Sequence, residues 1–237
     1  MPKILTQEAV GEFREKLIDA AEHLFAANGL EAVTMRQLAA ELGVSPMTPY
    51  RYFDDKNAIL AAVRARAFAR HADALEAAYA EAGDDVIAAS EKVGEAYVDF
   101  AFAHPEAYKL MFDITQPNEA QYPELVAAGD RSRRTMTRHL ETLAAAGQFH
   151  GDPGLIGHMF WSALHGPIML AFSGKLMAGY DVRQIIAALM AALERGVFGP
   201  GPALDRAQGV RLGGPPSLTE AGRSASASAA NTRSIRK

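Results

Sequence analysis

Apolar residues recur every three or four positions along most of the chain, and no segment alternates strictly enough to predict a strand. Near the N-terminus this period runs from Val10 to Leu24, and Gly29 suits the end of the helix that it predicts. The chain is therefore expected to be all-α. Further helices are predicted over residues 34–42, 55–81, 85–103, 105–115, 123–146, 153–177 and 181–197.

A second short helix is expected directly after the one over 34–42. Thr34 can cap that first helix, and Gln37 stands where a capping box needs it. Gly43 can adopt the positive φ that ends a helix. Ser45 is a favourable N-cap for the next helix, and Pro46 is its first residue, where a missing N–H is harmless. Because the link is so short, the two helices must cross steeply, as in a helix–turn–helix.

The second proline of the segment SPMTPYRYF falls at the fourth position of this helix. Pro49 lacks the N–H that would reach back to the Ser45 carbonyl, and its ring crowds that carbonyl. Thr48, which precedes it, is pushed away from helical angles. The full interior penalty of about 3 kcal/mol should not apply so near a helix end. We therefore expect a helix with a strained or partly 3₁₀ first turn.

The stretch TMRQLAAELGVSPMTPYRYFDDKNAIL resembles the DNA-binding signature of TetR/AcrR-family transcriptional regulators. That signature has a Thr, a Leu-Ala pair, Leu-Gly-Val, a Ser-x-x-Thr-aliphatic-Tyr-x-His/Tyr-Phe helix and a following Lys. The chain departs from it at Pro49, where the family usually has an aliphatic residue. The resemblance implies an N-terminal three-helix, helix–turn–helix DNA-binding domain over residues 1–62, with a long linking helix from about residue 55.

The resemblance also implies two kinds of DNA contact. Hydroxyls and a lysine ammonium suit phosphates, which fix register without reading sequence, and the matching residues are Thr34, Tyr50, Tyr52 and Lys56. An arginine can pair with guanine and a methionine can touch a thymine methyl, and the residues nearer the bases are Arg36, Pro46, Met47, Thr48 and Arg51. Ser45 is a further candidate for DNA contact.

Several of these residues have a purely structural interpretation. Tyr50 could be mainly a packing residue, and Arg51 a solvated charge. Met47 could be exposed apolar surface, and Lys56 an ordinary lysine of a first helical turn. Phe53 is expected in the core.

The second half of the chain carries a shorter resemblance. Trp161, His165 and Gly166 resemble the Trp-His-Gly signature of one TetR-family C-terminal domain type, and PEAYKLMF at 105–112 resembles a segment of the same type. Pro167 removes a helical hydrogen bond and should kink the helix. The resemblance implies that residues 63–198 form a helical domain that binds a small effector and forms a homodimer through its last two helices.

A kinked helix with small residues beside aromatic ones can leave a cavity. The effector is accordingly expected to be largely apolar, and the candidate lining residues are Tyr97, Phe100, Met111, Phe112, Trp161, His165 and Met169. Such a stripe at helical spacing can also be ordinary core, and His165 can be a core histidine with its hydrogen bonds satisfied.

Composition removes several classes of function. The 237 residues include no cysteine, which excludes disulfides, thiolate nucleophiles and Cys-based zinc sites. His158 and His165 alone are poor evidence for a metal, and no enzyme motif is present. We therefore expect no metal, no cofactor and no catalysis. The N-terminus lacks a signal-peptide pattern and the longest apolar run is too short for a membrane span, which favours a cytoplasmic protein.

Charge is spread unevenly. The formal net charge is −4, with −1 over the first 66 residues and +4 over 199–237. Bulk charge thus gives no sign of DNA binding, so any contact must be local. Residues 199–237 are rich in Gly, Pro, Ser and Ala and are predicted to form a disordered tail.

The expected function is a DNA-binding transcriptional regulator, specifically a repressor that a small molecule releases from a pseudo-palindromic operator on double-stranded DNA. Two alternatives remain open at this point: a DNA-binding or architectural protein that needs no ligand, and a transcriptional activator.

Overall fold

The computed structural model describes residues 6–112 and 118–199, and all regular structure in these ranges is helical, which confirms the all-α class. The predicted tail beyond Gly199 lies outside the described residues. In chain order the elements are α1 (Gln7–Asn28), α2 (Met35–Glu41), η1 (Pro49–Arg51), α3 (Lys56–Glu81), α4 (Val86–Ala103), α5 (Pro105–Met111), η2 (Glu119–Gln121), α6 (Pro123–Ala145), α7 (Pro153–Phe172) and α8 (Val182–Phe198).

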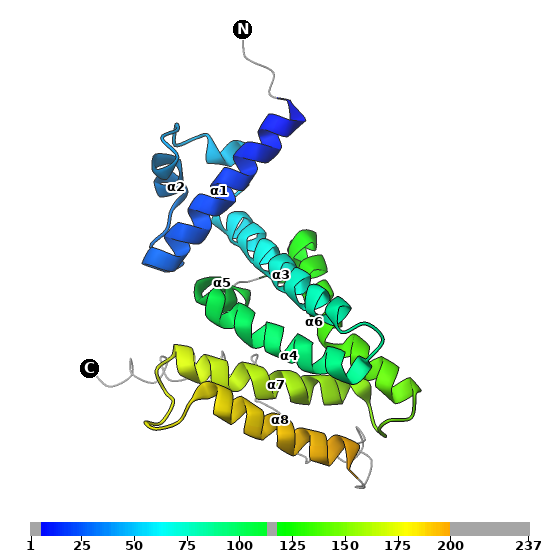
Figure 1. The fold of residues 1–237 in the computed structure, drawn as a ribbon. Helices are drawn as coiled ribbons and strands as arrows, with labels where there is room; N and C mark the ends of the chain where they lie inside the picture. The colour runs from blue at the N-terminus through cyan, green and yellow to red at the C-terminus, as the bar shows by residue number, and fades with distance from the viewer. Residues whose placement is uncertain (1–5, 113–117, 200–237) are drawn as a thin grey trace, which may run out of the picture.

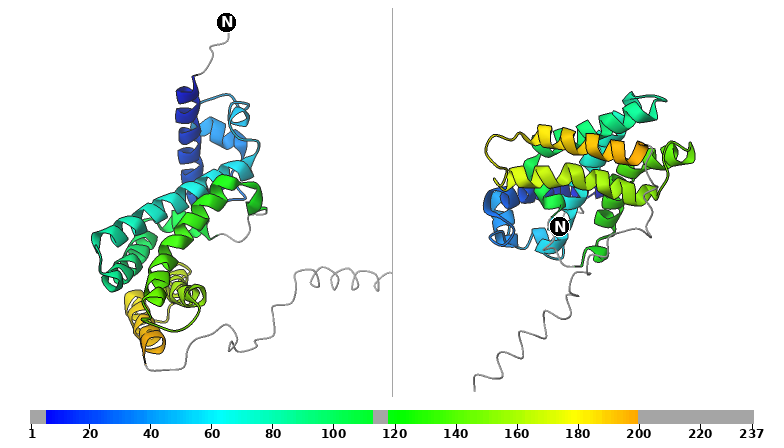
Figure 2. Two further views of the ribbon diagram at one scale, coloured as in Figure 1. Left: turned by 90° about the vertical axis from the view of Figure 1, so that its right-hand side faces the viewer. Right: turned by 90° about the horizontal axis from the view of Figure 1, so that it is seen from below.

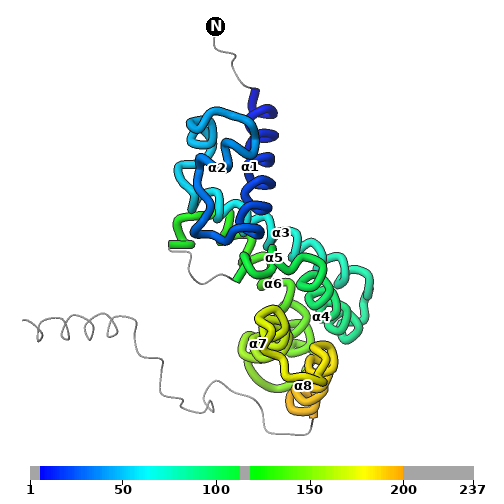
Figure 3. Tube along the Cα trace, turned by 90° about the vertical axis from the view of Figure 1, so that its left-hand side faces the viewer, coloured from blue at the N-terminus to red at the C-terminus, as the bar shows by residue number. Residues whose placement is uncertain are grey.

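The helices form two packed groups that share α3. Figure 1 shows α1, α2 and the start of α3 at one end, and α7 beside α8 at the other. The views in Figures 2 and 3 agree that α3 runs from the first group into the second, where α4 and α6 lie along it. A single long helix therefore joins the two ends of the molecule.

Local chemistry sets the helix ends. The Thr34 hydroxyl accepts from Gln37 N at 3.3 Å and the Gln37 side chain accepts from Thr34 N at 2.8 Å, which confirms the capping box. Gly43 has φ 63°, and Val44 N donates to Ala39 O at 2.9 Å, so α2 ends in a Schellman motif. Two helices are shorter than predicted: α5 ends at Met111 and α7 at Phe172.

The expected helix after Ser45 is not a continuous α-helix, so this prediction was wrong in part. Ser45 O accepts from Thr48 N at 2.8 Å, and Thr48 O accepts from Arg51 N at 3.1 Å, so successive tight turns replace α-helical bonds. The 3₁₀ character predicted for the first turn extends over Pro49–Arg51. Thr48 keeps right-handed helical angles, φ −65° and ψ −45°, despite the proline that follows it.

Separate apolar cores hold the two groups. Leu17, Leu38 and Ile59 are fully buried in the first core, which joins α1, α2 and α3 and also takes in Leu110 of α5. Tyr97 and Ile168 belong to the second core, which extends over α3 to α8. The first core is therefore in direct contact with an element of the second group.

Close helix approach positions α7 in the second group. A Cβ at Gly157 would lie 2.9 Å from Cγ2 of Thr137 on α6, so a larger residue there requires the Thr137 side chain to shift. The helix continues through Pro167 to its end at Phe172.

Candidate nucleic-acid interface and interior cavity

An exposed edge of the first group carries most of the residues predicted to contact DNA. Pro49 is buried and anchors the turn, whereas Met47 is 67% exposed and Tyr50 is 48% exposed. Ser45, Pro46 and Arg51 are exposed beside them, and Arg36 is exposed on α2, which packs against η1. The buried proline thus turns the neighbouring polar and apolar side chains outward.

The remaining predicted DNA contacts also have structural partners. Tyr52 is half-buried against Phe13, with 4.7 Å between ring centroids, and its carbonyl accepts from Arg14 Nη1 at 3.2 Å. Lys56 donates from Nζ to Leu30 O at 2.9 Å. An ammonium has three donors, so this bond leaves Lys56 able to contact an anion.

Thr34 and Thr48 complete the set. The exposed Thr34 serves as the N-cap of α2, and the half-buried Thr48 precedes η1. The ten predicted residues therefore occupy the surface from the start of α2 to the start of α3, and three of them, Thr48, Tyr52 and Lys56, are half-buried.

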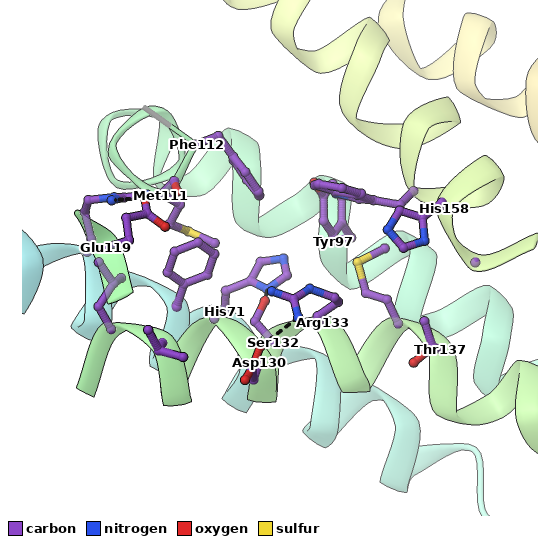
Figure 4. Close-up of a pocket in the computed structure, with 18 residues that line it drawn as sticks. His71, Tyr97, Met111, Phe112, Glu119, Asp130, Ser132, Arg133, Thr137 and His158 are labelled. Atoms are coloured by element: carbon purple, nitrogen blue, oxygen red, sulfur yellow. Dashed lines mark hydrogen bonds and ion pairs between the residues drawn. The ribbon is translucent and has the colours of Figure 1, made fainter. Parts of the chain in front are cut away.

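A cavity of about 300 Å³, partly open to solvent, lies between α3, α4, α5, α6 and α7 of the second group (Figure 4). Four of the predicted effector residues line it, namely Tyr97, Met111, Phe112 and Trp161. Phe100, His165 and Met169 are not among its lining residues, which corrects their placement.

Hydrogen bonding explains where His165 lies. Trp161 Nε1 donates to the Tyr97 hydroxyl at 2.9 Å, and that hydroxyl lies 2.6 Å from the Tyr108 hydroxyl. The Tyr108 hydroxyl lies 2.7 Å from His165 Nδ1. The tryptophan and histidine of the Trp-His-Gly pattern are thus linked through two tyrosines, and His165 has the satisfied hydrogen bond of a core histidine.

Phe100 and Met169 face other partners. Phe100 packs against His71 in a T-shaped arrangement, with 5.0 Å between ring centroids. Met169 packs against the second core. Periodicity placed both residues on an apolar face, but it could not separate core from cavity wall.

Sequence reasoning missed a histidine in the cavity wall. His71 on α3 is 1% exposed, and its Nδ1 lies 2.9 Å from the Ser132 hydroxyl on α6. Burial lowers the pKa of His71 to about 4, so the imidazole is neutral at neutral pH. The available signal was a single histidine within the alanine-rich stretch of the linking helix.

A buried arginine was also missed. Arg64 on α3 is 3% exposed and donates from Nε to Leu110 O at 2.8 Å and from Nη2 to Met111 O at 2.9 Å. Its Nη1 pairs with Glu119. Arg64 therefore joins α3 to the last turn of α5, beside the cavity.

Two findings concern other classes of site. The described residues contain no group of three or more His, Asp or Glu side chains that could hold a metal ion. His158, which the sequence offered as a weak metal candidate, has its Nδ1 2.8 Å from Gly154 O within its own helix. Within the same ranges α7 alone is long and apolar enough to cross a membrane, with a mean hydropathy of 1.3. Because α7 packs against α6 and α8, this is weak evidence for insertion.

Comparison with known proteins gives two family matches. Residues 17–63 match the model of bacterial regulatory proteins of the tetR family, and residues 90–193 match that of the tetracyclin repressor-like C-terminal domain. An uncharacterised HTH-type transcriptional regulator of Mycobacterium tuberculosis is 26% identical over 78% of this chain and 81% of its own length. The class D tetracycline repressor protein of Escherichia coli is 40% identical over 60 residues, which are 25% of this chain and 28% of that protein.

Solved structures give the same picture of the fold. A protein of unknown function from Rhodococcus sp. RHA1 is 33% identical and superimposes with a TM-score of 0.68 over 78% of this chain and 95% of that one. A bacterial regulatory protein of the tetR family from Rhodococcus RHA1 is 22% identical, with a TM-score of 0.60 over 76% of this chain and 95% of that one.

Proposed function

Because the chain belongs to the TetR family of DNA-binding transcriptional regulators, we propose that it is a homodimeric repressor that a small molecule releases from its operator. Family membership accounts for DNA-binding regulation, whereas repression and ligand-dependent release are our proposal. The observation that supports release is the cavity beside the last turn of α5, whose Leu110 belongs to the first core. We further propose that the protein works in the cytoplasm, without a membrane.

The last turn of α5 offers a direct connection between ligand and DNA. Met111 and Phe112 line the cavity, and the preceding Leu110 packs into the core of the DNA-binding group. Arg64 ties the carbonyls of Leu110 and Met111 to α3, which enters the same group. A ligand that displaces Met111 or Phe112 therefore acts on both α5 and α3. A population shift requires the ligand to bind one of the two resulting arrangements more tightly.

The exposed turn between α2 and α3 is proposed to enter the major groove. Met47, Tyr50 and Arg51 project from it, and Arg36 is exposed on the adjacent α2. In helix–turn–helix dimers each recognition element reads one half-site, and the half-sites lie about one helical turn of DNA, or a multiple of it, apart. Two copies of this chain then require a pseudo-palindromic operator.

The outer faces of α7 and α8 are proposed to form the dimer interface. On α8, Leu189 is 39% exposed, and Ala192 and Gly196 continue the same face at helical spacing. On α7, Ser162 and Leu170 are exposed, and Leu170 is 46% exposed. Small residues on both helices allow four helices to approach closely across a two-fold axis.

Replacing Lys56 by methionine is expected to weaken binding to all DNA sequences alike, by roughly three- to tenfold, because a phosphate contact carries no sequence information. The slope of log K against the logarithm of the salt concentration should become shallower by about 1, the value for one lost phosphate contact. Fluorescence anisotropy titrations with specific and random duplexes at several salt concentrations measure both quantities.

The matched control for this variant is Lys92→Met. Lys92 lies on α4 and pairs with Glu81, away from the DNA-binding group. Its loss should leave affinity and salt dependence unchanged. Because Lys56 also bonds Leu30, the unfolding transition of the variant must be measured as well. Wild-type affinity and salt slope in a folded Lys56→Met protein would remove Lys56 from the interface.

A reporter fused to the DNA that flanks the gene tests repression and release. Deleting the gene should raise expression of the reporter, whereas an activator would require expression to fall. Compounds that restore expression in the presence of the protein should also raise its melting temperature, because a ligand bound to the folded state stabilises it. Compounds that bind the purified protein without changing operator affinity would defeat the ligand-release step.

A further inference from the structure

We propose that the cavity takes an uncharged, compact ligand that is apolar except for one hydrogen-bond acceptor, and that Nε2 of His71 donates to this acceptor. The inference rests on the proposed function of the cavity as the effector site and specifies the chemistry of the effector.

The first support is an unpaired polar atom in the wall. Nε2 of His71 is buried and has no hydrogen-bond partner among residues 6–112 and 118–199. Figure 4 shows the imidazole projecting from α3 into the space bounded by Phe112 and Tyr97. The Tyr97 hydroxyl, by contrast, is bonded to Trp161 and to Tyr108. A buried group left without a partner carries a desolvation cost that a ligand atom can relieve.

The position of the imidazole proton follows from Ser132. Within the described part of the chain the Ser132 hydroxyl bonds to Nδ1 of His71 at 2.9 Å, and no other partner of that hydroxyl is found there. Donation from the hydroxyl to Nδ1 leaves no hydroxyl proton buried and unpaired. The single proton of the neutral ring then resides on Nε2. The atom that faces the cavity is therefore a donor, which requires an acceptor on the ligand.

The charges around the cavity argue for an uncharged ligand. Arg64 is paired with Glu119 and also bonds two carbonyls of α5. Arg133 pairs with Asp130 at 2.7 Å. An ionised ligand would have to compete with these existing pairs for a counter-ion, whereas an uncharged ligand leaves them intact.

Size and lining restrict the ligand further. The volume of about 300 Å³ lies at the lower end of the roughly 300–1,000 Å³ of typical ligand pockets. Aromatic and thioether side chains form a large apolar part of the wall, contributed by Phe68, Met111, Phe112, Met136 and Trp161. A compact body that contains a ring or a short branched chain, with one carbonyl or ether oxygen, fits these conditions.

Three small probes test the inference in the full-length protein. Acetophenone carries an acceptor, α-methylstyrene is its hydrocarbon isostere, and benzoate is an anion of similar size. Trp161 is the chain's single tryptophan and lines the cavity, so its indole N–H gives one NMR signal that reports occupancy. Acetophenone should bind roughly three- to tenfold more tightly than α-methylstyrene, the equivalent of one neutral hydrogen bond. Benzoate should bind most weakly.

Two variants test whether the preference for the ketone over the alkene depends on His71. In His71→Leu the ketone and the alkene should bind equally. His139→Leu is the matched control, because His139 is also a buried histidine with an unpaired ring nitrogen but does not line the cavity. It should keep the wild-type preference. Long-range ¹H–¹⁵N spectra of the wild-type histidines give a second measurement that needs no variant: Nε2 of His71 should carry the proton and shift when the ketone binds.

Several results would overturn the inference. These are equal affinity for the ketone and the alkene in the wild type, a preference that survives in His71→Leu, tightest binding of benzoate, or no response of Trp161 to any probe. The proposed function fails separately. If the ketone binds with the His71-dependent preference but leaves operator affinity unchanged, the inference on ligand chemistry stands and ligand-dependent release does not.

Discussion

Replacing Arg64 by methionine is expected to lower the free energy of unfolding by about 3 kcal/mol. The substitution keeps much of the aliphatic stem but removes the donors to Leu110 O and Met111 O. Carbonyls left unpaired in a buried setting cost about 1–3 kcal/mol each. Glu119 loses its partner too, but half of its side chain is exposed, so water screens the remaining charge and that part of the cost is small. Urea unfolding followed by circular dichroism measures the change.

Arg64→Met is also expected to weaken the link between cavity and DNA. Without the arginine, α5 can move without displacing α3, so a cavity ligand should change operator affinity less in the variant than in the wild type. The ratio of operator affinities with and without ligand gives this coupling.

The matched control for Arg64→Met is Arg183→Met. Arg183 also joins two helices by an ion pair, to Asp99 at 2.8 Å, but its side chain is 58% exposed. Exposed pairs of this kind contribute up to about 1 kcal/mol, so Arg183→Met should change stability little. Equal destabilisation by the two variants would show that the hydrogen bonds from Arg64 to α5 contribute no more to the free energy of unfolding than an exposed ion pair does.

Acidification from pH 7 to pH 4 is expected to destabilise the protein by roughly 3–6 kcal/mol through its buried histidines. Burial lowers the pKa of His71 and of His139 to about 4, whereas both titrate near 6.5 in the unfolded chain. Between these values the unfolded state binds more protons, so stability falls as the pH falls. Burial also lowers the pKa of His165, which adds to the effect. Urea unfolding at intervals across this window measures the slope.

The double variant His71→Leu, His139→Leu is the control for this pH dependence. It removes both buried histidines, so most of the slope between pH 6.5 and pH 4 should disappear. Each single variant should remove about half. An unchanged slope in the double variant would mean that other groups cause the acid lability.

The sequence predicted the helices well where their ends depend on local chemistry. Thr34 with Gln37, and Gly43 with its positive φ, carry their capping function in a few adjacent residues, and both were predicted correctly. The turn at Pro49 was predicted only in part. Its 3₁₀ geometry continues because tertiary burial of Pro49 and Phe53 holds the segment, and periodicity carries no information about that burial.

The cavity was the least predictable feature. Tyr97, Met111, Phe112 and Trp161 were identified from spacing and resemblance, but the same spacing also selected Phe100, His165 and Met169, which lie elsewhere. The α3 and α6 walls, with His71 and Ser132, depend on which faces of two long helices meet. Contacts between residues 61 positions apart cannot be deduced from a local pattern.

The proposed mechanism joins these parts in one path. The cavity meets α5 at Met111, α5 enters the DNA-binding core through Leu110, and Arg64 holds both to α3. The turn that carries Met47 and Tyr50 lies between α2 and α3, so a shift of α3 changes its direction. In a dimer such a shift changes the spacing of the two turns, which sets the fit to a two-part operator.

Footprinting of the DNA that flanks the gene tests the central claim most directly. The account predicts that the wild-type protein protects a pseudo-palindrome whose half-sites lie about one helical turn, or a multiple of it, apart, and that one dimer occupies it. At a concentration just sufficient for the wild-type protein to protect this site, Lys56→Met should leave it unprotected. A uniform, sequence-independent pattern of protection, or a single half-site occupied by a monomer, would contradict the account.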